Sequence, residues 1–133
     1  MCIRDSPWGD TFDRLRCNTE ELGLKTTTPV GIFPDGASPY GVLDMSGNVY
    51  EWTRSLWGED LEKPSFGYPY TPQDGREDET AADRVLRVVR GGSWISDASL
   101  GRCACRLGYF PHLGYGNGNN GFRVAVSPST SGL

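Results

Sequence analysis

Apolar and polar positions alternate over short stretches of this chain, and no long stretch carries apolar residues at helical spacing. β-Branched and apolar residues concentrate at residues 85–90 and 121–126, which we predict to form strands. Residues 100–107 alternate between a Leu/Arg/Ala/Arg side and a Gly/Cys/Cys/Leu side, as a half-buried strand does. The pattern also allows a short helix over residues 13–21. It therefore excludes helix bundles and predicts short strands joined by much irregular backbone.

Turn-forming residues are spread along the whole chain of 133 residues, which contains 18 glycines and 9 prolines. This length suffices for one domain with a core, but not for two. Residues 57–84 and 109–120 are predicted to be long loops, because both are rich in glycine and polar residues. Loops of this length are usually functional, or are held by something other than their own core. Residues 127–133 form a polar tail that is predicted to be disordered.

Residues 41–52 combine carboxylates with turn-forming residues. Asp44 and Glu51 offer hard oxygen ligands, and Gly47 and Asn48 let the backbone turn so that the carbonyls between them point to one place. The segment therefore predicts either a bound Ca²⁺ or a rigid turn whose acids accept hydrogen bonds from backbone N–H groups. Calcium binding is the leading hypothesis.

Three segments carry a resemblance to a known family: GNVYEW at residues 47–52, RVVRGGSW at 87–94 and NNGFRV at 119–124. In this order they resemble the formylglycine-generating enzyme family, also called the sulfatase-modifying factor family. The resemblance implies an irregular α+β fold related to the C-type lectin fold, with short strands and a high coil content. It makes residues 7–126 the C-terminal portion of the family domain. Residues 1–6 match nothing in the family pattern and are interpreted as a leader or a truncation junction outside the fold.

The resemblance also implies a first calcium site at the acidic turn. The position of Asp44 supplies a side-chain oxygen, those of Gly47 and Val49 supply backbone carbonyls, and that of Glu51 supplies a carboxylate. All four positions match chemically in this chain. Asp44 and Glu51 have the required carboxylates, and the backbone carbonyls of Gly47 and Val49 are present whatever the side chain.

A second calcium site is implied at Asn18, through its side chain, and at Thr19, through its carbonyl. The family's aspartate at this site corresponds to Leu22, which has no ligating side chain. The second site is therefore intact only if Glu20 or Glu21 takes the place of that aspartate.

The redox chemistry is where the sequence departs from the family pattern. Active members resemble copper oxidases that hold Cu(I) between two cysteine thiolates five residues apart and oxidise a substrate cysteine to formylglycine. Cys103 aligns with the second of this pair and is the candidate catalytic residue, but the first falls near Ala98, which has no sulfur. In a strand, Cys105 would lie about 6.5–7 Å from Cys103, a long span for two-coordinate Cu(I), so it does not reproduce the family geometry. Cys103 and Cys105 are therefore interpreted as small buried residues. Bound Cu(I) is not expected.

The remaining aromatic and charged residues divide between packing and surface roles. Trp52, Trp94 and Phe122 are expected in the core. His112 is expected to be an exposed loop residue. Arg90, Arg106 and Arg123 are expected to pair with Asp44, Asp97 or loop carbonyls, and Tyr109, Phe110 and Tyr115 could line a groove for a peptide.

Three functional hypotheses remain open. The leading one is a calcium-stabilised domain of the sulfatase-modifying factor type that lacks the copper pair and acts as a binding or accessory module for a peptide or protein. The second is an active oxidoreductase of the family, either a formylglycine-generating oxidase or the C-terminal domain of an iron-dependent sulfoxide synthase. The third is a lectin-like module for a peptide or glycan. The net charge of −4 argues against nucleic acid, and no apolar run approaches the roughly 18 residues that span a bilayer, so we expect a soluble protein whose compartment and oligomeric state stay open.

Overall fold

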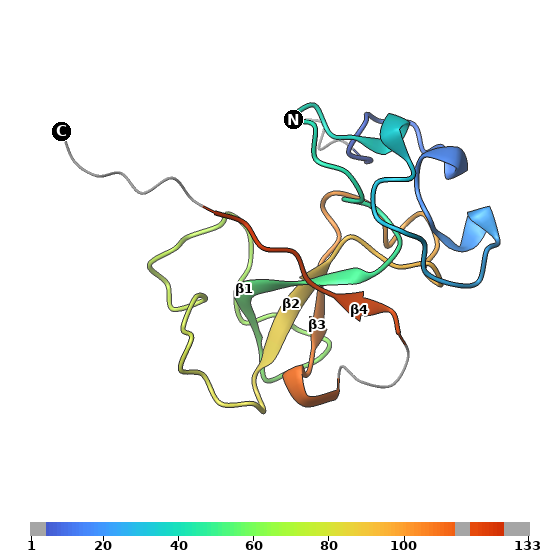
Figure 1. Cartoon of the computed structure of the whole chain (residues 1–133). Coiled ribbons are helices and arrows are strands. Elements are labelled where there is room, and N and C mark those ends of the chain that lie inside the picture. Colours follow the sequence, from blue (N-terminus) through green and yellow to red (C-terminus); the bar gives the residue numbers. More distant parts are fainter. Residues whose placement is uncertain (1–4, 114–117, 127–133) are drawn as a thin grey trace.

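The computed structural model describes residues 5–113 and 118–126. Its regular elements form one four-stranded sheet, with strand order β3-β2-β1-β4, and several single turns of 3-10 helix (Figure 1). The strands are β1 (Tyr50–Gly58), β2 (Leu86–Arg90), β3 (Leu107–Tyr109) and β4 (Asn120–Gly121), and the 3-10 turns are η1 (Arg14–Arg16), η2 (Glu20–Leu22), η3 (Pro34–Gly36) and η4 (Pro111–Leu113). The described part of the chain contains no α-helix, and irregular backbone makes up most of it. The expected short strands and high coil content are confirmed, whereas the helical part of an α+β fold is reduced to these turns.

The sheet brings the C-terminal end of the domain beside the acidic turn. β1 and β2 are antiparallel and place Glu51 opposite Arg90, with register shifts after Trp52 and again after Leu56. β2 and β3 are also antiparallel. β4 pairs with β1 in parallel over two positions only, and one of them sets Gly121 beside Glu51.

The three strand predictions had different outcomes. Residues 85–90 are confirmed as β2, but β1 lies in a stretch where we predicted no strand. The strand predicted over 100–107 is wrong, because Asp97 accepts hydrogen bonds from the N–H groups of Ser99 at 2.8 Å and Leu100 at 3.3 Å and closes a turn there. Of the strand predicted over residues 121–126, only Gly121 belongs to a strand.

The helix allowed over residues 13–21 is replaced by η1 and η2. Asp13 caps η1 by accepting a hydrogen bond from the Leu15 N–H at 2.9 Å. The turn ends at Cys17, whose backbone is extended with φ −158° and ψ 162°. Cys17 is buried, so its tertiary contacts fix the extended backbone that interrupts the helix.

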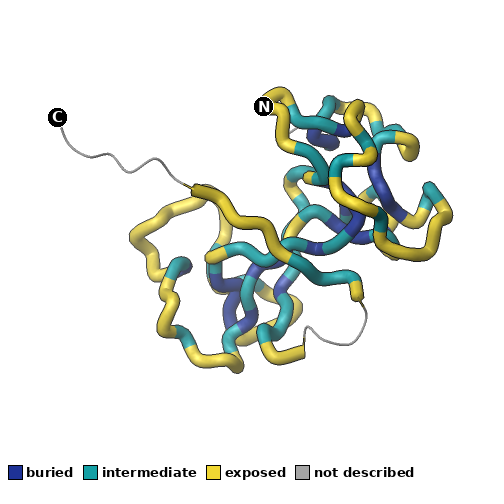
Figure 2. The backbone as a smooth tube through the Cα atoms, viewed as in Figure 1, coloured by how far each residue is buried: buried dark blue, intermediate teal, exposed yellow. Residues whose placement is uncertain are grey.

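The apolar core is small and lies against the sheet. Trp57, Leu86 and Val88 form it, and Phe110 packs against them. Gly108 on β3 admits the indole, because a Cβ at this position would come within 2.5 Å of the Trp57 ring. Figure 2 shows buried backbone in the strands and in the segments that lead from them to the N-terminal part, with exposed backbone along the outer loops.

The loop after β1 is held by a buried arginine. Arg76 is 3% exposed and donates to both carboxylate oxygens of Asp74, at 2.6 to 3.1 Å, and to the carbonyls of Gly67 and Pro69. Its guanidinium also lies 4.8 Å from the centre of the Tyr70 ring. The long loop predicted from residue 57 onward is therefore present and has an ordered centre of its own.

The two ends of the chain are only partly described. Residues 1–4 and 127–133, which include most of the predicted leader and all of the predicted tail, lie outside the described residues. Asp5 forms an ion pair with Arg102 at 2.6 Å and accepts a hydrogen bond from the Cys103 N–H, and Ser6 is 3% exposed. These two residues of the predicted leader therefore contact the domain. No helix in the described ranges is long and apolar enough to cross a membrane.

Candidate functional site

The acidic turn is built on backbone conformations that few side chains adopt. Asp44, Gly47 and Asn48 have φ values of 54°, 78° and 66°. Glycine adopts such values freely, and Asp and Asn tolerate them better than other residues do. The sequence Asp-x-x-Gly-Asn is therefore suited to this path of the chain.

Two remote segments fix the turn in place. Asn18 and Gly47 form a parallel bridge, in which the Asn48 N–H donates to the Asn18 carbonyl at 2.7 Å. On the other side, the Gly47 N–H donates to the Gly91 carbonyl at 2.7 Å, and the Trp94 N–H donates to the Asn48 carbonyl at 3.0 Å. The first and second motif segments of the sequence therefore meet at this turn.

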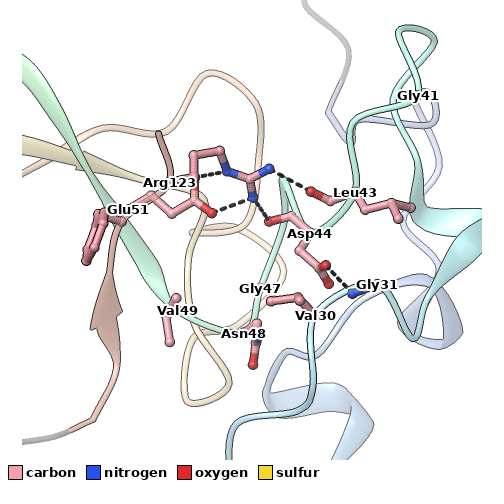
Figure 3. A pocket seen from close by; sticks show the side chains of 11 residues that line it. Val30, Gly31, Gly41, Leu43, Asp44, Gly47, Asn48, Val49, Glu51 and Arg123 are labelled. Atoms are coloured by element: carbon pink, nitrogen blue, oxygen red, sulfur yellow. Dashed lines mark hydrogen bonds and ion pairs between the residues drawn. The ribbon is translucent and has the colours of Figure 1, made fainter. Parts of the chain in front are cut away.

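The predicted ligands of the first calcium site line one cavity of about 380 Å³ (Figure 3). Asp44, Gly47, Val49 and Glu51 all belong to its wall. The other lining residues are Val30, Gly31, Gly41, Leu43, Asn48, Phe122 and Arg123. The sequence thus identified four residues that the fold brings together.

The two carboxylates in this cavity have different partners. Asp44 accepts a hydrogen bond from the Gly31 N–H at its Oδ2, at 2.7 Å. Glu51 forms a bidentate ion pair with Arg123, whose Nε lies 2.6 Å from Oε2 and whose Nη2 contacts Oε1. In Figure 3 the carboxylate of Asp44 points toward Gly31, while that of Glu51 faces the guanidinium. The Asp44 carboxylate thus accepts a hydrogen bond from a backbone N–H, as the rigid-turn alternative predicts. Glu51 instead has an arginine as its partner.

Arg123 is surrounded by oxygen atoms. Its Nη1 donates to the Leu43 carbonyl and its Nη2 to the Asp44 carbonyl, both at 2.8 Å. The hydrogen bonds from Arg123 to Glu51, together with the charges of Glu51 and Asp44, raise the pKa of the guanidinium above its ordinary value. The cavity therefore presents carbonyl and carboxylate oxygens that already attract one cation.

No group of three or more His, Cys, Asp or Glu side chains that could hold a metal occurs among the described residues. Calcium at the acidic turn would therefore depend on the backbone carbonyls of Gly47 and Val49 as well as on the two carboxylates. Calcium accepts such mixed oxygen ligands.

The residues of the second predicted calcium site are deeply buried. Asn18 and Thr19 are 1% and 0% exposed. The Asn18 amide nitrogen donates to the Thr26 carbonyl at 2.9 Å, but its Oδ1 is buried with no hydrogen-bond partner among the described residues. Buried polar atoms are rarely left without a partner, so this oxygen marks a place for a ligand or an ordered water.

Glu21 lies close to this pair in sequence and is also incompletely paired. Its Oε1 accepts a hydrogen bond from the Ala98 N–H at 2.7 Å, whereas its Oε2 is buried with no partner in the described part of the chain. Although burial opposes the change, the nearby Thr19 hydroxyl and the hydrogen bond from the Ala98 N–H lower the pKa of Glu21. Glu21 is therefore the better of the two glutamates suggested for replacing the missing aspartate.

The cysteines show no copper pair. They stand at positions 2, 17, 103 and 105, so no two of them are five residues apart. Cys103 is half-buried in a turn, and its carbonyl accepts a hydrogen bond from Arg90. Burial raises the pKa of the Cys105 thiol, which disfavours the thiolate that binds Cu(I). Cys103 and Cys105 therefore do not lie on a strand, contrary to the prediction for residues 100–107.

Arg90, Arg106 and Arg123 bind loop carbonyls, as expected. Arg90 donates to the Cys103 carbonyl, and Arg106 donates to the Phe66 carbonyl at 3.1 Å. Arg123 adds the Leu43 and Asp44 carbonyls to its ion pair. The pairing of Arg123 with Glu51 was not predicted, because the two residues lie far apart in sequence and no local pattern links them.

The aromatic residues differ from expectation at two places. Phe122 is 77% exposed, so its predicted core position is wrong, because the chain leaves the sheet after Gly121. Tyr109 packs edge-on against Trp52, with ring centres 6.0 Å apart, and Phe110 packs on the core, so both are committed to packing instead of a groove. His112 is exposed as expected, and Tyr115 lies outside the described residues.

Comparison with known proteins gives consistent matches. The Sulfatase-modifying factor enzyme 1-like domain matches residues 4–128. A serine/threonine-protein kinase pkn1 of Chlamydia caviae is 38% identical over 119 residues, which are 90% of this chain and 17% of that protein. The inactive C-alpha-formylglycine-generating enzyme 2 of Bos taurus is 31% identical, over 90% of this chain and 36% of that protein.

Two further matches extend the comparison to an enzyme and to a solved structure. The formylglycine-generating enzyme of Thermomonospora curvata is 33% identical, over 92% of this chain and 43% of the enzyme. The structure of Treponema denticola variable protein 1 superposes with a TM-score of 0.62 at 26% identity, over 89% of this chain and 40% of that one. The chain thus spans less than half the length of each of these relatives.

Proposed function

Because the chain belongs to the Sulfatase-modifying factor enzyme 1-like domain family, we propose that it is a formylglycine-generating-enzyme-like module that binds a protein or peptide and does not carry out copper-dependent oxidation. The cysteine positions carry this proposal, because Cu(I) prefers soft sulfur ligands and the copper site of the family uses two thiolates five residues apart, whereas this chain has no pair at that spacing. The relatives include one protein named as a formylglycine-generating enzyme and one named as inactive, so family membership alone does not decide the chemistry.

The proposal includes a structural calcium ion at the acidic turn. The hydrogen bond from Gly31 uses only Oδ2 of Asp44, so Oδ1 keeps its lone pairs for a ligand. Gly47, Val49 and Glu51 line the same cavity and complete a set of hard oxygen donors. When bound, the ion would join strand β1 to the turn before it, and it would supply no redox chemistry.

The unpartnered Oδ1 of Asn18 supports a second ion in the same way. Thr19 would add its carbonyl and Glu21 its carboxylate. We further propose that the sheet and its long loops follow the C-type-lectin-like fold of the family, in which ordered loops present the binding surface. The small apolar core is consistent with a domain that needs bound ions for part of its stability.

Metal titrations of one preparation test both parts of the proposal. We expect Cu(I), added without oxygen, to give no stoichiometric thiolate absorption, and we expect Ca²⁺ to raise the melting temperature. A calcium concentration 100 times the Kd contributes about 2.7 kcal/mol to stability. Asp44→Asn should reduce the response to calcium by the share of the acidic turn and leave only that of the second site, whereas Asp83→Asn, which removes an exposed loop carboxylate, should preserve the full response.

The copper part and the calcium part of the proposal are contradicted by different results. Stoichiometric copper that is lost in Cys103→Ala would restore the oxidase hypothesis. An identical response to chelator in wild type, Asp44→Asn and Asp83→Asn would exclude calcium at the acidic turn.

A further inference from the structure

The carboxylate of Glu51 is shared between the calcium site proposed above and an internal cation. Arg123 engages both oxygens of Glu51 and lies in the same cavity wall as Asp44, Gly47 and Val49. Without metal, the Glu51 carboxylate faces the guanidinium, and the charge of Asp44 adds to the attraction on this one cation. A divalent ion ligated by Glu51 would place two more positive charges beside that guanidinium.

The ion pair also fastens the end of the described chain to the site. β4 has only two paired positions, and the chain after Gly121 lies outside the ladder. Phe122, Val124 and Val126 are 77%, 81% and 88% exposed, so their packing contributes little to holding this segment down. Arg123 stands between these exposed residues and reaches back to β1 and the acidic turn.

We propose that Arg123 is an internal cation that competes with the divalent metal for Glu51, so that metal binding loosens residues 122–126 from the site. The inference rests on the proposed calcium site. The two cations overlap at Glu51 alone, because Arg123 otherwise uses the carbonyls of Leu43 and Asp44, whereas the metal would use the Asp44 carboxylate and the carbonyls of Gly47 and Val49.

Because the metal and Arg123 share only Glu51, Arg123 lowers the affinity of the site for the metal. Metal binding is weakened by the nearby guanidinium but is not blocked, because Asp44 and the two carbonyls remain available. By reciprocity, the metal weakens the hold of Arg123 by the same factor that Arg123 weakens the metal. Couplings between sites are typically 5-fold to 150-fold, and we expect about tenfold here, because one ligand of several is shared.

Calorimetric titration with Ca²⁺ tests the competition in wild type, Arg123→Gln and Arg102→Gln. Arg102 is the matched control, because it forms an exposed ion pair with Asp5 that is not part of the cavity. We expect calcium to bind Arg123→Gln about tenfold more tightly than wild type, and Arg102→Gln to bind like wild type. Arg123→Lys keeps the charge but loses the planar fork, and it should give an intermediate affinity even if Arg123→Gln folds poorly.

Hydrogen exchange of the wild-type protein supplies a readout that needs no variant. Amides of residues 118–126 should exchange faster with saturating Ca²⁺ than with chelator, while those of β2 should be unchanged or slower.

The outcomes separate this inference from the proposed function. Equal or weaker calcium binding by Arg123→Gln, or slower exchange of residues 118–126 with calcium, would overturn the competition and leave the calcium site intact. Absence of calcium binding in all variants would overturn both.

Discussion

The approach of Gly47 to Asn18 provides a sharp test of how the acidic turn is held. A Cβ at Gly47 would lie 2.4 Å from the Asn18 carbonyl oxygen, 2.7 Å from its carbon and 3.1 Å from the Asn18 nitrogen. All three are backbone atoms, and Asn18 is itself buried, so the neighbour cannot move aside cheaply. Gly47→Ala should therefore separate the turn from the Asn18 segment.

Two terms contribute to the expected loss. Gly47 has φ +78°, and an L-residue in this left-handed region costs about 1–2 kcal/mol. Forcing a methyl group into a filled space costs about 1–3 kcal/mol more. We therefore expect Gly47→Ala to lower the free energy of unfolding by about 2–5 kcal/mol.

Gly41 offers the matched control. Its φ of +76° is nearly that of Gly47, but nothing lies within 4 Å of a Cβ built on it. Gly41→Ala should therefore cost only the backbone term, about 1–2 kcal/mol. Urea unfolding of both variants, with chelator present to remove any contribution from metal, isolates the steric term as the difference between them. The contrary result is a loss of free energy of unfolding that is equal in the two variants to within about 0.5 kcal/mol, the usual effect of a neutral surface change. That result would show that Gly47 does not pack closely on Asn18.

Two further predictions concern the core and the long loop. Leu86→Ala should reduce the free energy of unfolding by about 2–5 kcal/mol, because Leu86 is 0% exposed within the core, whereas Val124→Ala at an 81% exposed position should have little effect; comparable losses in urea unfolding would contradict the assignment of the core. Hydrogen bonds from Arg76 hold the pKa of Asp74 below its ordinary value, so the stabilisation from this carboxylate is complete above the unfolded pKa of about 3.9 and is lost as the pH falls through the lower folded value. The stability difference between wild type and Asp74→Asn should accordingly shrink as the pH is lowered from 6 to 2, and a difference that stays constant would show that Asp74 is not paired in solution.

Local chemistry predicted the parts of the structure that depend on neighbours in sequence. The valine-rich residues 85–90 form β2, since β-branched side chains suit a strand wherever one is possible. The ligands of the acidic turn lie within eight residues of each other, so their arrival at one cavity follows from a single turn with glycine at the bend. The loop after β1 was likewise readable from its glycine, proline and acidic residues.

Remote partners decided what the sequence could not predict. β1 contains charged residues and two register shifts, so its alternation is broken, and it forms because β2 pairs with it. Residues 100–107 alternate as a strand would, but Asp97 closes a turn before them, and Gly101 is buried in a position where its carbonyl accepts a hydrogen bond from the Ser46 hydroxyl. Arg123 reaches Glu51 across 72 positions, and no window of local sequence contains that relation.

The loop between β1 and β2 offers a place to divide the chain. Its ends are joined by an exposed ion pair between Glu59 and Arg84, and its centre is organised by Arg76, while the strands on either side pair with each other independently of the loop's outer residues. A cut at an exposed position such as Leu61, away from the carbonyls that Arg76 binds, would leave β1 on one fragment and β2 on the other, and we expect the pairing of these strands to join the two fragments. The domain is therefore suited to use as a split protein, with reassembly of the halves reporting that two fused partners have met.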